Sequence, residues 1–199
     1  PSAGFDHVLL SQSTYLRNVW QGLRVARKVR PRVEAWGEAR RENQQFQNTR
    51  LVTTGEDRRG EQYDFALGAN WVASPRDRWG VSVGHRRKLA KNVTAAYRRE
   101  SVGVDYTRLL GRGMFLAAGV TGQFDRYDRP DVALYTDARN DDAVVTNLLF
   151  GMPLTLFWKP LDGFTGTVGW ERFSQHSNLL NYTYSNNRVS ASIGYRWGI

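Results

Sequence analysis

The sequence has no cysteine, only six prolines and no long apolar run in its 199 residues. Without cysteine, the chain forms neither disulfides nor thiolate metal sites. Because no window approaches ~18 consecutive apolar residues, a transmembrane helix is excluded. Glycine motifs for phosphates or dinucleotides are missing, and no spacing matches a calcium-binding loop. We therefore predict no cofactor and no metal site.

The first five residues, Pro1-Ser2-Ala3-Gly4-Phe5, contain neither the charged nor the apolar segment of a secretory signal. If the protein is exported, we expect this sequence to be a processed chain or a C-terminal portion.

Basic residues exceed acidic ones, 28 against 19, which gives a net charge of +9. Such a balance first suggests a soluble domain that binds nucleic acid. The basic residues are nevertheless spread over the whole chain, mostly within segments of alternating polarity. We therefore expect no nucleic-acid partner, and the soluble basic domain remains the last of four alternatives.

Large apolar residues alternate with small or polar ones over residues 189–199. This period of two predicts a strand with one apolar face, formed by Val189, Ala191, Ile193, Tyr195, Trp197 and Ile199. Strands of bacterial outer-membrane barrels alternate in this way, with one face in lipid and the other in the lumen. We expect the barrel-assembly machinery to recognise the last four apolar positions as a C-terminal signal: Ile193, Tyr195, Trp197 and Ile199.

Strand-like segments separated by turn residues recur along the chain, which is typical of an all-β barrel or sandwich. We predict nine strands at 15–28, 32–45, 62–73, 78–89, 99–110, 113–127, 143–159, 164–176 and 188–199, with a tenth as an alternative within 5–11. Short and long connections alternate, and every short one falls on the side of the C-terminus. Barrels have short periplasmic turns and longer outer loops, so we predict an antiparallel transmembrane β-barrel, either complete or part of a larger one. Residues 32–47 also suit a helix, since Ala, Glu, Arg and Gln favour one.

Aromatic residues cluster beside the short turns and at the C-terminus. In a barrel these ends lie at one membrane boundary, where an aromatic girdle belongs. We predict interfacial positions for Trp71, Trp79, Tyr106, Trp158, Phe164, Tyr195 and Trp197. The alternative is a soluble sandwich with an aromatic core, which would not require this clustering.

Charged residues within the strands share the face opposite to the large apolar ones. Because Lys or Arg facing lipid at mid-bilayer costs ~2–4 kcal/mol, these residues are expected to point inward. We predict that the lumen is lined by Arg24, Glu34, Glu38, Arg40, Arg86, Asp105, Asp125, Glu171 and Arg196. Such residues select ions or polar solutes in a wide barrel, and pair into a sealed core in a narrow one.

A His-Ser-Asn sequence at residues 176–178 resembles the signature of outer-membrane lipid A deacylases. Adjacent side chains of a strand point to opposite faces, however, and no carboxylate follows to orient the imidazole. We therefore predict that the protein is not an enzyme. Arg86, Arg87, Lys88 and Lys91 form a basic run that suits lipopolysaccharide phosphates, or solvent alone.

Residues 171–187 read ERFSQHSNLLNYTYSNN and lead into the terminal strand. This segment resembles the end of a group of outer-membrane barrels, in which a Ser-Asn pair and a Tyr-x-Tyr turn precede a last strand that closes in Tyr-Arg-Phe. The group includes the barrel domains of surface lipoprotein assembly modifiers and the β-barrel porins found beside exopolysaccharide genes. The resemblance covers residues 60–199, most clearly 164–199. The chain departs from the group by ending in Trp197-Gly198-Ile199 and by lacking the helical-repeat domain of the assembly modifiers.

The sequence thus predicts a protein of the bacterial outer membrane that works as a channel for passage or export of polar material. The expected partners are outer-membrane lipid and lipopolysaccharide, the barrel-assembly machinery, and other barrel or secretion-complex subunits. A sealed barrel acting through its surface loops is the main alternative, and an outer-membrane lipid hydrolase is the third.

Overall fold

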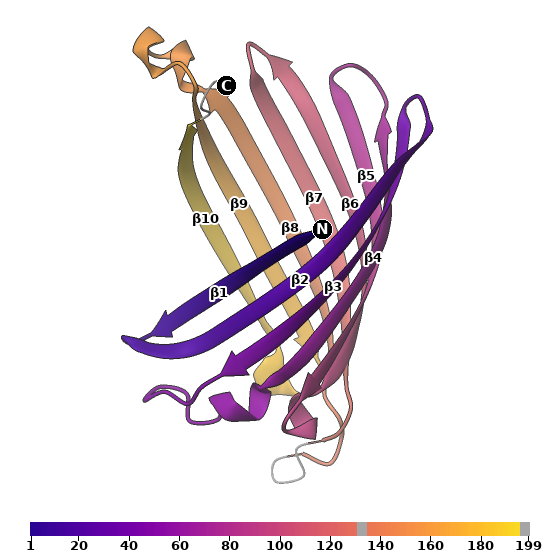
Figure 1. Cartoon of the computed structure of the whole chain (residues 1–199), viewed down its shortest axis with the longest axis vertical. Helices are drawn as coiled ribbons and strands as arrows, with labels where there is room; N and C mark the ends of the chain where they lie inside the picture. Colours follow the sequence, from indigo (N-terminus) through magenta and orange to yellow (C-terminus); the bar gives the residue numbers. More distant parts are fainter. Residues whose placement is uncertain (131–134, 196–199) are drawn as a thin grey trace.

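The computed structural model describes residues 1–130 and 135–195. They form one antiparallel sheet in which every strand pairs with its neighbours in sequence (Figure 1). The strands are β1 (Ser2–Leu10), β2 (Ser13–Arg30), β3 (Val33–Phe46), β4 (Gly60–Val72), β5 (Asp77–Ala90), β6 (Tyr97–Gly111), β7 (Met114–Tyr127), β8 (Asn140–Pro153), β9 (Phe164–Ser177) and β10 (Tyr184–Tyr195). The predicted all-β antiparallel fold is confirmed, with ten strands.

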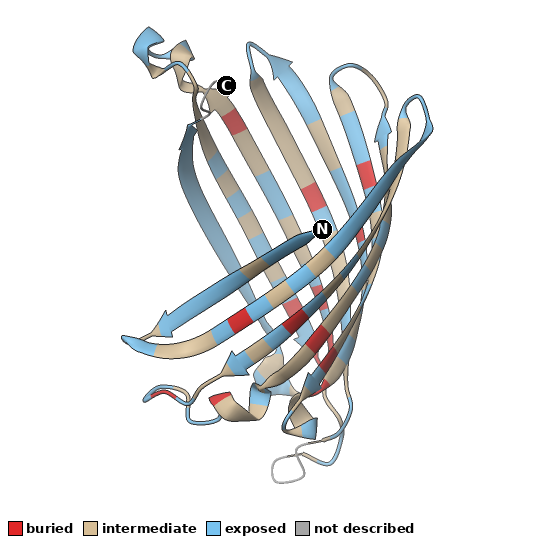
Figure 2. Cartoon of the chain, in the orientation of Figure 1, coloured by how far each residue is buried: buried red, intermediate tan, exposed pale blue. Residues whose placement is uncertain are grey.

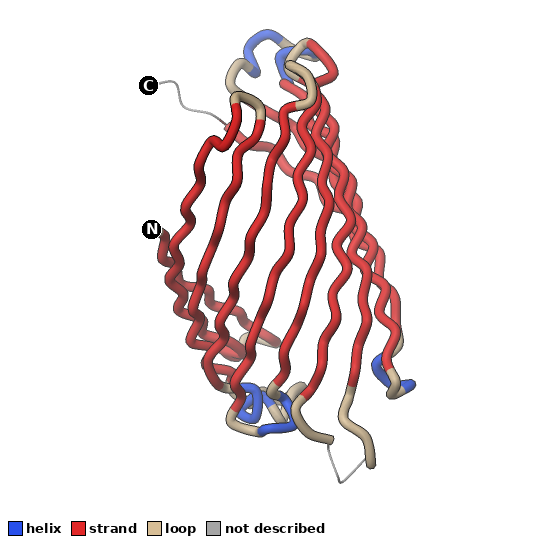
Figure 3. Tube along the Cα trace, turned by 90° about the vertical axis from the view of Figure 1, so that its right-hand side faces the viewer, coloured by secondary structure: helices blue, strands red, loops and turns tan. Residues whose placement is uncertain are grey.

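The sheet is a single curved layer, and Figure 3 shows its strands running side by side. Within residues 1–130 and 135–195, β1 pairs only with β2 and β10 only with β9, so the described sheet is open at both edges. The segment 32–47 forms β3, which pairs along its length with β2 and β4. The helical alternative for this segment is therefore wrong.

The connections lie at two ends of the sheet, and the C-terminal end of β10 lies at the end that we call the short-turn end. Connections 31–32, 73–76, 112–113 and 154–163 lie there, and the opposite end, the long-loop end, carries connections 11–12, 47–59, 91–96, 128–139 and 178–183. The expectation that all short turns share one end therefore fails at Ser11-Gln12. This two-residue turn has positive φ angles of 49° and 66°. Hairpin turns of this kind usually contain Asn, Asp or Gly at these positions, and Ser-Gln has none of them, so the turn was not predicted.

The predicted strand 143–159 is wrong at its C-terminal end. Strand β8 ends at Pro153, because proline has no N–H to continue a ladder. The 3-10 helices η3 (Leu154–Leu156) and η4 (Lys159–Leu161) follow. The other short helices, η1 (Gly55–Arg58), η2 (Val93–Ala95) and η5 (Leu180–Tyr182), lie at the long-loop end.

Most of each strand is exposed or intermediate, with single buried residues between (Figure 2). The two faces of the sheet differ in polarity and in burial. One face, the apolar face, exposes large hydrophobic side chains, among them Leu67 at 64% and Ile193 at 69%. The other, the polar face, holds most of the buried residues, such as Glu42, Lys88 and Asp125. Since polar-face residues of β3, β5, β6, β7 and β10 line a common cleft, this face is the concave one. Among the described residues only Ala96 and Ala143 are apolar and buried.

Glycines on the polar face make room for large side chains from neighbouring strands. Trp36 of β3 lies flat over Gly68 of β4, and a Cβ at Gly68 would also meet the Val81 carbonyl at 2.6 Å. A Cβ at Gly194 of β10 would meet nothing within 4 Å.

We expect Gly68→Ala to lower the free energy of unfolding by about 1–3 kcal/mol, because the added methyl overpacks Trp36 and the sheet backbone. Gly194→Ala is the matched control and should change it far less. Urea unfolding followed by tryptophan fluorescence measures both. Equal effects of the two substitutions would contradict this packing.

Candidate functional site

The structure places eight predicted lumen-lining residues on the polar face. They come from β2, β3, β5, β6, β7 and β9, and share that face by strand register. They are Arg24, Glu34, Glu38, Arg40, Arg86, Asp105, Asp125 and Glu171. The ninth, Arg196, lies outside the described residues.

Toward the long-loop end, polar side chains of neighbouring strands form hydrogen-bonded groups that follow one another across the polar face, and we call them together the polar belt. Its members are Asp6, Asn18, Glu42, Gln44, Gln62, Asp64, Arg86, Lys88, Arg99, Asp125, Asp141 and Gln175.

On the β1–β5 side of the belt, amides connect the charged groups. Asn18 Nδ2 donates to Asp6 Oδ2 at 3.1 Å and to Glu42 Oε2 at 3.2 Å. Gln44 Nε2 donates to the same Glu42 oxygen at 2.9 Å, and Gln44 Oε1 accepts from Lys88 Nζ at 2.5 Å. The Lys88 bond crosses over β4, which lies between β3 and β5, so this part of the concave face is closely packed.

On the β5–β9 side of the belt, guanidinium groups pair with carboxylates. Arg99 holds Asp125 through two hydrogen bonds of 2.5 and 2.7 Å, and Arg86 Nε donates to Asp64. The Asp125 side chain is only 7% exposed. A buried carboxylate needs such a paired geometry, since burial without a partner is costly.

Toward the short-turn end, the polar face carries mainly small residues. They include Gly80, Ser82, Gly103, Gly119, Thr121, Gly151, Thr165, Thr167, Gly169, Ser190 and Ser192. Asp105 lies across Gly80 in this region and is exposed. Among the described residues, no hydrogen bond or ion pair joins the Asp105 carboxylate, which distinguishes it from Asp64 and Asp125.

Two tryptophans on the polar face were not expected from the sequence. The Arg24 guanidinium lies 4.3 Å from the ring centroid of Trp36, and that of Arg40 lies 4.2 Å from Trp20. In this arrangement the aromatic ring attracts the cation, and the guanidinium group keeps part of its contact with water. The signal for them is their parity, because Trp20 and Trp36 lie an even number of residues from Arg24 and Arg40 in the same strands.

A cleft of about 610 Å³ opens at the long-loop end of the polar face. Tyrosines and cations dominate its wall, which includes Lys88, Tyr97, Tyr127, Arg139 and Tyr182. The Arg139 guanidinium lies 3.6 Å from the Tyr182 ring centroid and 4.6 Å from that of Tyr127. Burial lowers the pKa of Arg139, but its hydrogen bond to Asp141 and the electrostatic attraction of Asp141, Tyr127 and Tyr182 together outweigh burial, so the pKa lies above the ordinary value.

Six of the seven predicted interfacial aromatics belong to the described residues, and these six lie at the short-turn end. Trp71, Trp79 and Tyr106 are register partners across β4–β6 on the apolar face, with the Trp79 and Tyr106 centroids 4.5 Å apart. Phe164 and Tyr195 face each other at 4.6 Å. Trp158 lies between η3 and η4, outside any strand, so its assignment to a strand end is wrong.

Of the predicted C-terminal signal, Ile193 and Tyr195 lie on the apolar face of β10. Trp197 and Ile199 lie outside the described residues.

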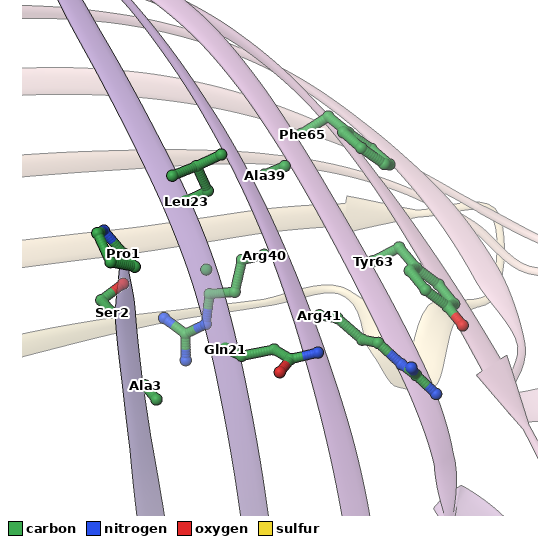
Figure 4. A pocket seen from close by; sticks show the side chains of 11 residues that line it. Pro1, Ser2, Ala3, Gln21, Leu23, Ala39, Arg40, Arg41, Tyr63 and Phe65 are labelled. Atoms are coloured by element: carbon green, nitrogen blue, oxygen red, sulfur yellow. The ribbon is translucent and has the colours of Figure 1, made fainter.

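A larger hollow of about 720 Å³ lies beside the start of β1 (Figure 4). Its wall includes Leu23, Ala39, Arg41, Tyr63 and Phe65, which belong to the apolar face of β2–β4. Arg41 and Tyr63 both bind Glu61. None of the belt residues lines the hollow, although Arg40 of the polar face does. We therefore place the candidate site on the polar face.

His176 and Ser177 lie on opposite faces of β9, as their adjacency required. The Ser177 hydroxyl accepts the Leu179 amide at 3.2 Å and supports the turn after β9. These two side chains therefore do not form a nucleophile–base pair.

Comparison of the sequence with protein-family models and with curated proteins finds no match. The resemblance to assembly modifiers and porins therefore depends on the residues of the chain itself. In the described part of the chain, no helix is long and apolar enough to cross a membrane.

We expect Arg99→Met to destabilise the fold by about 3–5 kcal/mol, because it leaves the buried Asp125 carboxylate unpaired. Arg24→Met removes an exposed pair, with Arg24 Nη1 3.5 Å from Glu38 Oε2, and should cost below about 1 kcal/mol. Urea unfolding measures both variants. A loss in Arg99→Met no larger than in Arg24→Met would show that the belt is hydrated and loose.

Proposed function

We propose that the ten strands form the wall, or an arc of the wall, of a bacterial outer-membrane β-barrel that conducts polar material. The observation that carries the proposal is the inverted burial: large apolar side chains are exposed on the convex face while charged ones are buried on the concave face. A soluble sheet of this size would bury its apolar face against a second layer. A membrane barrel leaves it exposed to lipid.

The dimensions of the apolar face support a membrane. On β7 it runs from Leu116 to Phe124, nine residues that span about 26 Å along the strand, and tilt shortens this toward about 20 Å along the membrane normal. The first charged residues beyond it at the long-loop end are His85, Glu100, Arg126, Asp142 and Arg172. Trp71, Trp79 and Tyr106 border it at the short-turn end, as an aromatic girdle would.

A membrane barrel also requires closed edges, because each unpaired backbone group in hydrocarbon costs several kcal/mol. The free edges of β1 and β10 must therefore pair, either with each other or with further strands. We propose that the barrel-assembly machinery and any partner barrel subunits act on these edges and on the end of β10.

Within the barrel, the polar belt would be the narrow part and the small residues toward the short turns the wide part. Long loops usually face outward, which places the belt toward the cell exterior. The exposed, unpaired Asp105 carboxylate would attract cations in the wide part, whereas paired Asp125 contributes little net field. The resemblance of residues 171–187 favours a relationship to assembly modifiers or exopolysaccharide-associated porins.

The pairing of the belt charges favours a second candidate, a sealed barrel that acts through its loops. Opposite charges that neutralise each other need no water between them, as in narrow barrels. Conductance separates the two candidates directly.

We expect the protein to require detergent for solubility and to give a β-sheet circular dichroism spectrum. On a denaturing gel, the unheated sample should migrate differently from the heated one, because a closed barrel resists the detergent. A soluble monomer without a heat-dependent shift would contradict the membrane proposal.

In planar bilayers we expect discrete conductance steps that favour cations, and Asp105→Asn should weaken this preference by removing a fixed anion from the lumen. Glu100→Gln is the matched control, since it removes the same charge from the apolar face. The reversal potential in a salt gradient measures the preference. A silent protein would favour the sealed barrel, and equal shifts in the two variants would exclude Asp105 from the path.

A further inference from the structure

Three arginines stand side by side on the apolar face near the long-loop end. Arg87 of β5 is the register partner of Arg98 of β6, and Arg98 is the partner of Arg126 of β7. Neighbouring strands lie about 4.8 Å apart, so the three side chains leave the sheet as one group. We call them the arginine row. The basic run read from the sequence is divided here: Arg87 belongs to the row, whereas Arg86 and Lys88 lie on the polar face.

The charges of the arginine row are incompletely neutralised by the protein. Arg87 binds both oxygens of Asp128 at 2.7 and 2.6 Å. Arg126 Nη1 lies 2.7 Å from Asp142 Oδ1 and also donates to two backbone carbonyls. In the described ranges, Arg98 has neither an ion pair nor a side-chain hydrogen bond, and its side chain is exposed. Like charges directly opposite each other destabilise a sheet, so the central guanidinium needs an anion that none of residues 1–130 and 135–195 supplies.

The arginine row surrounds a hollow. His85, Arg87, Arg98, Arg126, Tyr127 and Asp128 line a space of about 520 Å³. His85 Nδ1 lies 2.8 Å from Glu100 Oε1, so that carboxylate is engaged with the imidazole. Each guanidinium has five N–H donors. Among residues 1–130 and 135–195, no acceptor binds any of the five N–H groups of Arg98. The Nε and Nη2 groups of Arg126 also have no hydrogen-bond acceptor there.

The row lies directly beside the apolar surface. On β5, His85 lies between Arg87 and Val83 on this face, and Val83 is 53% exposed. On β6, Glu100 lies between Arg98 and Val102, and Val102 is 54% exposed. On β7, Phe124 is the next residue on that face, and it is 41% exposed. A ligand held by the row would therefore have its remaining part against a strip of exposed apolar side chains.

From this juxtaposition we propose that the arginine row binds the phosphates of a phosphorylated glycolipid, of the lipid A type, whose acyl chains lie along the apolar face of β5–β7. Arginine suits phosphate because its planar donors form paired, charge-assisted hydrogen bonds. The exposed valines and Phe124 favour a lipid over a free phosphate, which would use only the row. The position of this lipid in the outer leaflet rests on the proposed membrane function. The affinity of the arginine row for phosphate does not rest on it.

The test uses the full chain purified in detergent and titrated with lipid A carrying both phosphates, followed by native mass spectrometry. The same lipid without phosphates is the first comparison. We expect the phosphorylated lipid to bind at least about tenfold more tightly, and Arg98→Ala to remove most of this difference. Arg98→Lys, which retains the charge without the paired donors, should retain part of it.

Arg17→Ala is the matched control. Arg17 is exposed on the apolar face of β2, near the same end but four strands away, and it also lacks an ion pair among the described residues. It should leave binding within about twofold of the unmodified protein. Circular dichroism and the heat-dependent gel shift verify that each variant is folded.

Several results would overturn the site. They are equal binding of the two lipids, equal losses in Arg98→Ala and Arg17→Ala, or displacement of the lipid by millimolar inorganic phosphate, which would indicate a soluble anion instead. The outcome of this test is independent of conduction. If the protein does not conduct but binds the lipid only when the lipid carries phosphates, the lipid site is supported and the channel proposal is contradicted. A protein that is soluble without detergent removes the membrane placement itself.

Discussion

The structure depends on one constraint, which is that the two faces of a single curved sheet require different surroundings. The convex face exposes side chains such as Leu67, Val104 and Ile193 without a second layer to cover them. The concave face buries Glu42, Lys88 and Asp125. In water the hydrophobic effect would favour collapse or association of the convex face. In a bilayer the same face is solvated by acyl chains, and the polar belt becomes the interior of the protein.

The concave face divides into two regions because of side-chain size. Toward the long loops, long side chains such as Arg86 and Lys88 reach across neighbouring strands and fill the curvature with ion pairs and hydrogen bonds. Toward the short turns, Gly103, Gly119 and Thr167 leave space, and Asp105 remains unpaired. A barrel built in this way would have a narrow, electrically balanced outer part and a wider inner part. The division separates two roles: the paired belt residues contribute to the stability of the fold, and the unpaired Asp105 in the wider part carries the proposed selectivity.

Most of the fold was predictable because strand parity is a local property. Alternation placed Arg86, Asp105 and Glu171 on one face before any pairing was known. The misassigned features depend on non-local geometry. The turn at Ser11-Gln12 has neither Gly, Asn nor Asp at its two positive-φ positions, and the cross-strand arginine row requires the register of three strands. Trp20 and Trp36 lie on the polar face because Gly4 and Gly68 on adjacent strands make room for them, which a period of two within one strand does not reveal. The candidate site was therefore predicted as a face, and its internal pairing was not.

The absence of cysteine from the chain allows a direct test of the central claim, that the convex face contacts lipid and the concave face contacts water. Single cysteines placed in turn at residues 81, 82, 83, 101, 102 and 104 can carry a polarity-sensitive fluorophore after reconstitution into vesicles. The account predicts that probes at Val81, Val83, Val102 and Val104 are quenched by lipid-attached nitroxides, and that probes at Ser82 and Ser101 are quenched only by aqueous iodide. Quenching by iodide at all six positions, with no alternation, would contradict it.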